Sequence, residues 1–195
     1  MATSSFICSV DVAPVRAGPH DSSEQVTQLL LGEPVELEET RDGWCRVRTA
    51  YDYPGWVRED ALVDGTGTLT GASPYKDPIE AARSYLGTPY EWGGMTERGI
   101  DCSGLVHMGY RRTGRLVPRD ADQQEAAATP IDDADARPGD LVCFGEPGHA
   151  HHIAFWLGDG RILHATGRDG VNAVVEESLA NVDERRVRFA RLTIR

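Results

Sequence analysis

The feature that most constrains the fold is a segment rich in glycine and threonine, DGTGTLTGAS at residues 64–73. It has few large apolar side chains, so it is typical of a linker and cannot add to a packed core. The 195-residue length suits two small domains, and the 40% hydrophobic content is enough to give each a core. We therefore predict an all-β domain at residues 1–68, a linker at 69–77 and a second domain at 78–195.

Before the linker, short runs of β-type residues alternate with turn residues, as in a small antiparallel barrel. Arg41, Asp42 and Gly43 supply a hairpin turn. The segments VRAGP, LLLGEPVELEE, GWCRVR and YPGWV, in this order, resemble bacterial SH3-like domains. The predicted strands are residues 10–12, 28–30, 35–37, 44–48 and 55–57.

After the linker, the pattern changes to helices followed by strands. Apolar residues at helical spacing predict a helix over residues 78–86, with Pro78 at its start and Gly87 after its end. A second helix is predicted to begin at Cys102, with Asp101 as N-cap, and to end at residues 113–114. We predict an α+β domain whose helices pack on an antiparallel sheet. The predicted strands are residues 141–144, 153–157, 161–165 and 187–192, with a turn at 158–160.

Charge and composition exclude several classes of function. The net charge of −11 disfavours nucleic acid and anionic membrane surfaces, which are bound mainly by Lys and Arg. The sequence has no long apolar run and no signal-peptide pattern at its start, so we expect a cytoplasmic protein without a membrane partner. We expect no metal or other cofactor, and free thiols at the four scattered cysteines, Cys8, Cys45, Cys102 and Cys143.

Cys102 is the predicted nucleophile. At the start of a helix its sulfur lies beside unpaired backbone N–H groups and the positive end of the helix dipole, which favour thiolate over thiol. The alternative for an isolated cysteine is a buried side chain on a helix face. The sequence around it, DCSG, and the histidines further along the chain favour the nucleophile.

His152 and His164 are predicted to meet across a hairpin. His152 is expected to open one strand, His164 lies in the next, and antiparallel pairing brings such residues together. His152 would accept the thiol proton of Cys102 and later protonate the leaving amine, while His164 would orient and stabilise it. The alternative is a zinc cluster of His149, His151 and His152 with Cys143 and His164. Against it, neighbouring residues of a strand face opposite ways and no HExxH or CxxC spacing is present.

Several spaced motifs between residues 78 and 192 closely resemble the NlpC-type family of bacterial cell-wall cysteine peptidases. The motifs are TPYEWGG, GIDCSGLVHMGYRRTG, VPRDADQQ, RPGDLVCF and HHIAFWLGDGRILHATG. The resemblance implies a reduced papain-like domain that cleaves the bond between γ-D-glutamate and a diamino acid. It assigns Cys102 as nucleophile, His152 as base and His164 as the third polar residue. It also implies that Tyr90 supports the oxyanion region, for which a core tyrosine is the alternative.

The same resemblance implies that the substrate is a free murein peptide that begins with L-Ala, recycled by the cell. Asp101, Ser103 and Asp120 match positions that line the substrate pocket, where the carboxylates of Asp101 and Asp120 would bind the free amine of the peptide. Tyr53 matches a residue that the barrel contributes. His151 adjoins the proposed base and is a further candidate for the pocket. Two other functions stay open: an amidase or acyltransferase that uses the same Cys–His site, and a non-catalytic wall-binding adaptor.

Overall fold

A computed structural model of the chain describes residues 5–69, 74–183 and 186–193. The chain forms two compact units, Met1–Gly71 and Ala72–Arg195, which are described separately below. The division falls inside the predicted linker, of which residues 70–73 lie outside the described residues. None of the helices in the described part of the chain is long and apolar enough to span a bilayer.

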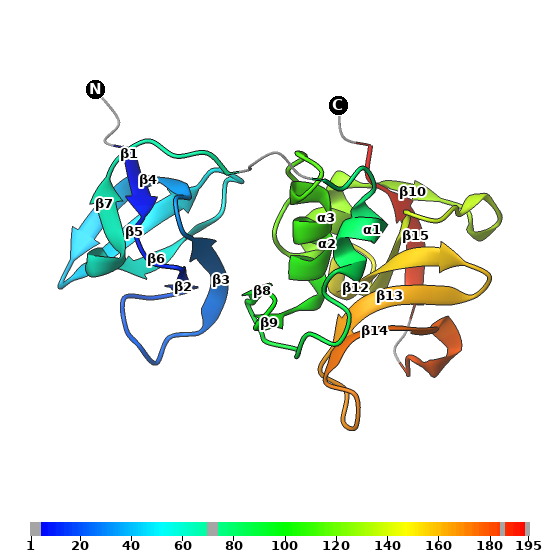
Figure 1. The fold of residues 1–195 in the computed structure, drawn as a ribbon. Coiled ribbons are helices and arrows are strands. Elements are labelled where there is room, and N and C mark those ends of the chain that lie inside the picture. The colour runs from blue at the N-terminus through cyan, green and yellow to red at the C-terminus, as the bar shows by residue number, and fades with distance from the viewer. Residues whose placement is uncertain (1–4, 70–73, 184–185, 194–195) are drawn as a thin grey trace. The chain divides into compact units, whose positions relative to one another are not determined.

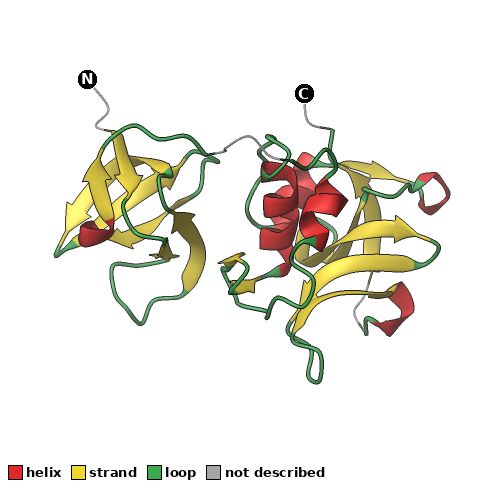
Figure 2. Cartoon of the chain, in the orientation of Figure 1, coloured by secondary structure: helices red, strands yellow, loops and turns green. Residues whose placement is uncertain are grey.

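The first unit is a seven-stranded antiparallel sheet with the order β3-β2-β6-β5-β4-β1-β7 (Figures 1 and 2). Side chains from several of its strands share one core, which includes Val15, Leu29 and Val47. Its all-β architecture agrees with the sequence prediction. The strands are β1 (Ser5–Cys8), β2 (Val12–Arg16), β3 (Gln25–Leu30), β4 (Pro34–Arg41), β5 (Trp44–Thr49), β6 (Pro54–Arg58) and β7 (Leu62–Asp64), with a short 3-10 helix at Glu59–Ala61.

One predicted strand of this unit is wrong. Residues 9–11 form the bend between β1 and β2, so the strand predicted at residues 10–12 is a connection over most of its length. Val10 is exposed, because the chain turns there instead of pairing. The predicted hairpin turn is confirmed: Asp42 and Gly43 have positive φ angles of 50° and 77°.

The second unit packs helices against a six-stranded antiparallel sheet with the order β10-β15-β11-β12-β13-β14 (Figures 1 and 2). This is the α+β arrangement expected from the sequence. Its helices are α1 (Pro78–Arg83), α2 (Cys102–Arg111) and α3 (Ala121–Ala127). Its strands are β8 (Met95–Thr96), β9 (Gly99–Ile100), β10 (Thr129–Ile131), β11 (Leu141–Glu146), β12 (His149–Gly158), β13 (Arg161–Thr166), β14 (Ala173–Ser178) and β15 (Arg186–Arg191), and 3-10 helices lie at Asp133–Asp135 and Leu179–Asn181.

The helix α2 is the centre of this unit, because it packs against α1 on one side and against β12 and β13 on the other. A side chain at Gly109 would come within 2.8 Å of the Pro78 carbonyl oxygen and 3.1 Å of the Phe155 ring. Glycine is therefore required for the close approach of these elements. The close packing holds the C-terminal half of α2 against α1 and against β12, the strand that carries His152.

Several element boundaries differ from the prediction. The first helix ends at Arg83 and continues to residue 86 only as turns. Strand β12 begins at His149, so His152 lies inside the strand and does not open it. The sequence prediction also missed α3 and β14, whose short segments contain few large apolar residues.

Candidate active site

The N-terminus of α2 positions Cys102. Asp101 is the N-cap, as predicted, and its Oδ1 accepts a hydrogen bond of 2.6 Å from the backbone N–H of Gly104. Backbone hydrogen bonds from Ile153 and Ser103 reach the thiol of Cys102. Because Ile153 directly follows His152 on β12, the thiol lies next to the strand that carries the candidate base.

Burial makes the thiol of Cys102 a weak acid, which corrects the prediction of a favoured thiolate. Burial, with a smaller contribution from the Asp101 carboxylate, raises the pKa of the Cys102 thiol to about 12. The two backbone hydrogen bonds and the charge of Arg119 oppose this shift without cancelling it. The start of a helix stabilises a thiolate by a local effect, whereas loss of water from the whole site has the stronger effect here.

His152 and His164 meet across the β12–β13 hairpin, as predicted. Nε2 of His152 lies 2.7 Å from Nδ1 of His164, and the two rings are nearly perpendicular at 73°. Both side chains are buried, and the hairpin register pairs Phe155 with Leu163. With Nε2 engaged in this way, Nδ1 is the ring nitrogen of His152 that does not contact His164.

His152 is a weaker base than the sequence suggested. Burial, with smaller contributions from the neighbouring His164 and His151, lowers its pKa to about 3. Near neutral pH the ligand-free site therefore contains a neutral thiol and a neutral imidazole. Transfer of the proton from Cys102 to His152 requires stabilisation of the imidazolium that results.

The carboxylate of Glu177 contacts His164 on the side away from His152 and lengthens the chain of hydrogen bonds. Oε1 of Glu177, on β14, lies 2.9 Å from Nε2 of His164. Its other oxygen accepts hydrogen bonds from Arg168 at 2.8 Å and Asn181 at 3.2 Å. Burial alone would raise the pKa of Glu177, but hydrogen bonds from Arg168, His164 and Asn181 outweigh burial and lower it to about 2.

The Asp101 carboxylate is already engaged by protein donors. Arg119 binds it through both terminal guanidinium nitrogens, Nη1 and Nη2, at 2.9 and 2.8 Å, and this pair is almost fully buried. The backbone N–H groups of Gly93 and Gly104 and the hydroxyl of Ser103 complete its contacts. These contacts argue against the predicted role of Asp101 as the group that binds a substrate ammonium.

The other candidates of this unit lie around the start of α2 and β12. Ser103 is buried, and its Oγ accepts from Arg119 at 2.9 Å. Tyr90 is half-buried, pairs with Ile100 through an isolated β-bridge, and its ring lies against Gly167. Asp120 is the half-buried N-cap of α3, and its backbone N–H donates to Gln123 at 3.4 Å. The catalytic role of Tyr90 and the substrate contacts of Ser103 and Asp120 stay predictions.

His151 lies on the opposite face of β12 from His152. Burial alternates along this part of the strand, with His149 and His151 exposed and His152 buried. The ring of His151 lies close to the backbone of Gly145, because a Cβ added there would come within 2.5 Å of its Nδ1. A contact of His151 with substrate stays a prediction.

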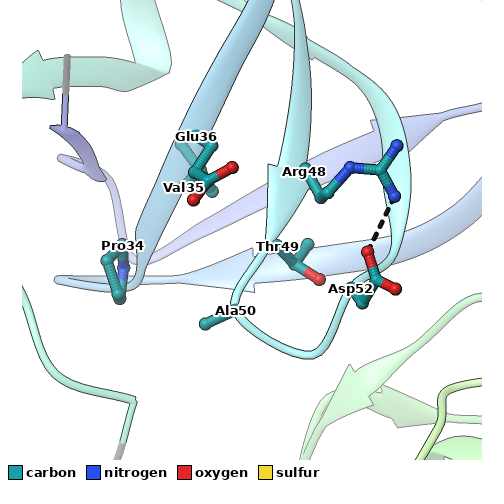
Figure 3. A pocket seen from close by; sticks show the side chains of 7 residues that line it. All are labelled: Pro34, Val35, Glu36, Arg48, Thr49, Ala50 and Asp52. Carbon is teal, nitrogen blue, oxygen red and sulfur yellow. Dashed lines mark hydrogen bonds and ion pairs between the residues drawn. The ribbon is translucent and has the colours of Figure 1, made fainter. Parts of the chain in front are cut away.

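Tyr53 belongs to the first unit, in the turn before β6. Its backbone N–H donates to Thr49 Oγ1 at 3.0 Å, and its ring lies 6.4 Å from that of Tyr51. The same unit has a hollow between the start of β4 and the end of β5, whose polar lining includes the Arg48–Asp52 ion pair (Figure 3). This hollow contains none of the predicted site residues, so the contribution of Tyr53 to a substrate pocket stays a prediction.

Among the described residues, no group of three or more His, Cys, Asp or Glu side chains is arranged to hold a metal ion. His149 is exposed, whereas His107 is fully buried with Nδ1 at 2.8 Å from the Val117 carbonyl oxygen. All four cysteines are free thiols and all are buried.

Sequence reasoning missed Arg119 and Glu177. Arg119 lies inside the motif VPRDADQQ, but its partner Asp101 is 18 residues earlier, so spacing alone gave no sign of an ion pair. The only signal for Glu177 was the AVVEES segment, which follows the strand of His164 after a turn at residues 167–172. Recognition of that segment as a strand would have placed a carboxylate near His164.

Sequence comparison matches each half of the chain to a known domain. Residues 87–188 match the NlpC/P60 family, and residues 15–62 match the bacterial dipeptidyl-peptidase Sh3 domain. The "Gamma-D-glutamyl-L-lysine dipeptidyl-peptidase" of Bacillus subtilis (strain 168) is 36% identical over 147 residues, which cover 74% of this chain and 48% of that protein. The "Peptidoglycan endopeptidase RipB" of Mycobacterium tuberculosis (strain CDC 1551 / Oshkosh) is 36% identical over 105 residues, 47% of this chain and 43% of that protein.

Comparison of structures gives the same fold. An NlpC/P60 family protein from Bacillus cereus ATCC 10987 superposes with a TM-score of 0.56 at 24% identity, over 96% of this chain and 63% of that one. The chain spans about half or less of the length of the curated relatives it matches, between 28% and 51% for the first three. The resemblance and the fold class predicted from the sequence are confirmed. The chain therefore belongs to the NlpC/P60 family, and this membership supports the predicted class of enzyme, a cysteine peptidase.

Proposed function

We propose that this protein hydrolyses the bond between γ-D-glutamate and a diamino acid in free murein peptides that begin with L-Ala. The observation that carries the proposal is the Cys102, His152 and His164 arrangement, which provides a nucleophile, a base and a group that orients the base. The N-terminal match to a dipeptidyl-peptidase Sh3 domain and the name of the Bacillus subtilis relative support this substrate class.

The proposed reaction gives each of these groups one role. Nδ1 of His152 takes the thiol proton as the sulfur of Cys102 attacks the γ-carbonyl carbon of D-glutamate. The tetrahedral intermediate then expels the amine of the diamino acid, which receives the proton from His152, and a thioester to Cys102 is left. Water, deprotonated by His152, attacks the thioester and releases L-Ala-γ-D-Glu with the thiol restored.

The free amine of the substrate needs an acidic partner, and Asp120 is our candidate. Asp101 is neutralised by Arg119, whereas Asp120 lies at the start of α3 and is half-buried. A carboxylate at this position would favour an ammonium group over an N-acetylated peptide. Recycling of free peptides in the cytoplasm is the physiological part of the proposal.

Product analysis by mass spectrometry tests this function. The substrates are L-Ala-γ-D-Glu-meso-diaminopimelate, the corresponding L-lysine peptide and the N-acetylated form of each. We expect cleavage of the free peptides only, loss of cleavage in Cys102→Ala, and a higher KM for free peptides in Asp120→Asn. Equal cleavage of the N-acetylated peptides would contradict the requirement for a free amine.

The alternatives give different products in the same assay. An amidase or acyltransferase would leave the γ-glutamyl bond intact, or would transfer the acyl group to an added amine instead of water. A wall-binding adaptor would cleave none of the four peptides. It would sediment with purified peptidoglycan, and Cys102→Ala would bind as well as the unmodified protein.

A further inference from the structure

The Glu177 carboxylate ends a chain of hydrogen bonds that begins at the candidate base. His152 contacts His164 at 2.7 Å, and His164 contacts Glu177 Oε1 at 2.9 Å. The far oxygen of Glu177 is held by Arg168 and Asn181. Arg168 is fixed in turn, because its Nη1 donates to the Asn181 carbonyl oxygen at 3.0 Å. The carboxylate is thus anchored on the side away from the histidines.

The chemistry of these groups determines which ring nitrogen of His164 and of His152 carries a hydrogen. An ionised carboxylate only accepts hydrogen bonds, so Nε2 of His164 must carry a hydrogen. In a neutral His164 the other nitrogen, Nδ1, is then an acceptor, and Nε2 of His152 must donate to it. A neutral His152 with hydrogen on Nε2 has a lone pair on Nδ1, which is the ring nitrogen that does not contact His164.

We propose that Glu177 is a positioning residue that sets the tautomers of His164 and His152 and so makes Nδ1 of His152 the acceptor of the Cys102 proton. The inference rests on the proposed function only in taking Cys102 as nucleophile and His152 as base. Glu177 also places a negative charge behind the imidazolium that forms on His152 during attack. This is the role of a third group in a catalytic triad, exerted here through an intervening histidine.

Among the described residues, the following charged and titratable groups face this chain of hydrogen bonds. Glu177 faces His164 from β13 and Arg168 from the segment after it. His152 faces His164 and is influenced by His151, and the Cys102 thiol is influenced by Asp101 and Arg119. Arg168 neutralises Glu177 on one side only, so the carboxylate oxygen that faces His164 keeps its acceptor role.

We expect Glu177→Gln to reverse the direction of donation in the hydrogen bonds that join residue 177, His164 and His152. Arg168 and Asn181 both donate to Oε2 of Glu177, so the amide oxygen of glutamine would take that place. Its NH₂ group would then face Nε2 of His164 and force that nitrogen to accept. His164 would carry its hydrogen on Nδ1, and His152 would carry its own on Nδ1, where it blocks acceptance of the thiol proton.

The test compares Glu177→Gln with Glu177→Ala and with the matched control Glu176→Gln. Glu176 is the preceding residue of β14 and pairs with Arg83 and Arg161 at the surface. We expect kcat to fall on the order of 10³- to 10⁴-fold in Glu177→Gln, as when a reversed histidine tautomer disables a serine peptidase. Glu177→Ala removes the acceptor without adding a donor, and we expect a loss of about 10- to 100-fold. KM should stay unchanged in the Glu177 variants, and the control Glu176→Gln should keep the activity of the unmodified protein.

A merely structural role for Glu177 predicts the opposite order, because glutamine preserves the shape and packing that alanine removes. Activity in Glu177→Gln equal to or above that in Glu177→Ala would overturn the proposal. Nitrogen-15 NMR of the histidine rings in the unmodified protein at pH 7 gives a second test that needs no variant. We expect hydrogen on Nε2 of both His152 and His164, and hydrogen on Nδ1 of either would also overturn it.

The rate of Cys102 alkylation by iodoacetamide separates this inference from the proposed substrate. Glu177→Gln should slow alkylation at pH 7 by about 10²-fold and move the pH midpoint of the reaction upward, because the thiol loses its proton acceptor. This shift without cleavage of murein peptides by the unmodified protein would refute the proposed function and support the positioning role. Peptide cleavage by the unmodified protein, with the same alkylation profile in Glu177→Gln and Glu176→Gln, would support the proposed function and refute the positioning role.

Discussion

Replacement of Arg119 by methionine should destabilise the second unit strongly. Methionine keeps the aliphatic length of arginine but removes the guanidinium, which contacts both oxygens of Asp101, the hydroxyl of Ser103 and the carbonyl of Gly94. The side chains of Arg119 and Asp101 are only 1% and 8% exposed. Asp101 would therefore be left as a buried charge without its cation.

The size of the effect follows from this burial. Loss of one partner of a buried ion pair costs about 3–5 kcal/mol, because the remaining charge is uncompensated. For a chain of this size that corresponds to a fall in Tm of roughly 6–20 °C. Arg161 is the matched control, since it is 54% exposed and pairs with Glu176 at 3.3 Å, and surface pairs contribute about 0–1 kcal/mol. A second substitution, Asp101→Asn in the Arg119→Met background, should restore part of the loss.

Urea unfolding and calorimetry of Arg119→Met, Arg161→Met and the double variant measure these differences. The alkylation profile of Cys102 gives an independent readout. Because the charge of Arg119 lowers the pKa of the Cys102 thiol and Asp101 raises it, the pH midpoint should move upward in Arg119→Met. A loss of stability below about 1 kcal/mol, no larger than in Arg161→Met, would refute the assignment of Arg119 and Asp101 as a stabilising buried pair.

Three further predictions follow from the second unit. Burial lowers the pKa values of His107 and His152 to about 3, so the unfolded chain binds more protons between the ordinary histidine pKa and pH 3. The free energy of unfolding should therefore fall as the pH is lowered through that range, by at most about 1.4 kcal/mol per pH unit for each histidine. Urea unfolding at pH 7 and pH 4 tests this. An equal dependence of the free energy of unfolding on pH in His107→Gln and in the unmodified protein would contradict it. Gly109→Ala should cost about 1–3 kcal/mol, because the added methyl group meets the Pro78 carbonyl and the Phe155 ring, and an unchanged Tm would contradict the close contact. Cys143→Ala should keep peptidase activity whereas Cys102→Ala loses it, and loss in both would show that the nucleophile is wrongly assigned.

The sequence predicted the parts of the site that depend on local pattern. Cys102 could be placed because the N-cap Asp101 and the spacing of apolar residues identify the start of α2. The contact between His152 and His164 could be predicted because a hairpin turn fixes which strands pair. In both cases the determining residues lie within one helical turn or one hairpin.

The rest of the site depends on contacts between distant segments. The acidity of the Cys102 thiol is set mainly by burial under the folded unit, which outweighs the local helix start. Strand β14 is a strand because it pairs with β13, and its own residues Glu176 and Glu177 give little β-type signal. The ion pair of Arg119 and Asp101 likewise exists only once α2 and the segment before α3 pack together.

The buried thiol of Cys102 has a further consequence for the chemical durability of the enzyme. Peroxide and other oxidants attack the thiolate, and sulfinic and sulfonic acids formed from it are not readily reversed. A thiol whose pKa is raised to about 12 is almost entirely protonated at neutral pH and is therefore a poor target for oxidants. The resting protein should keep Cys102 reduced in air without added reductant, while in the proposed mechanism the same sulfur becomes reactive when His152 takes its proton during attack.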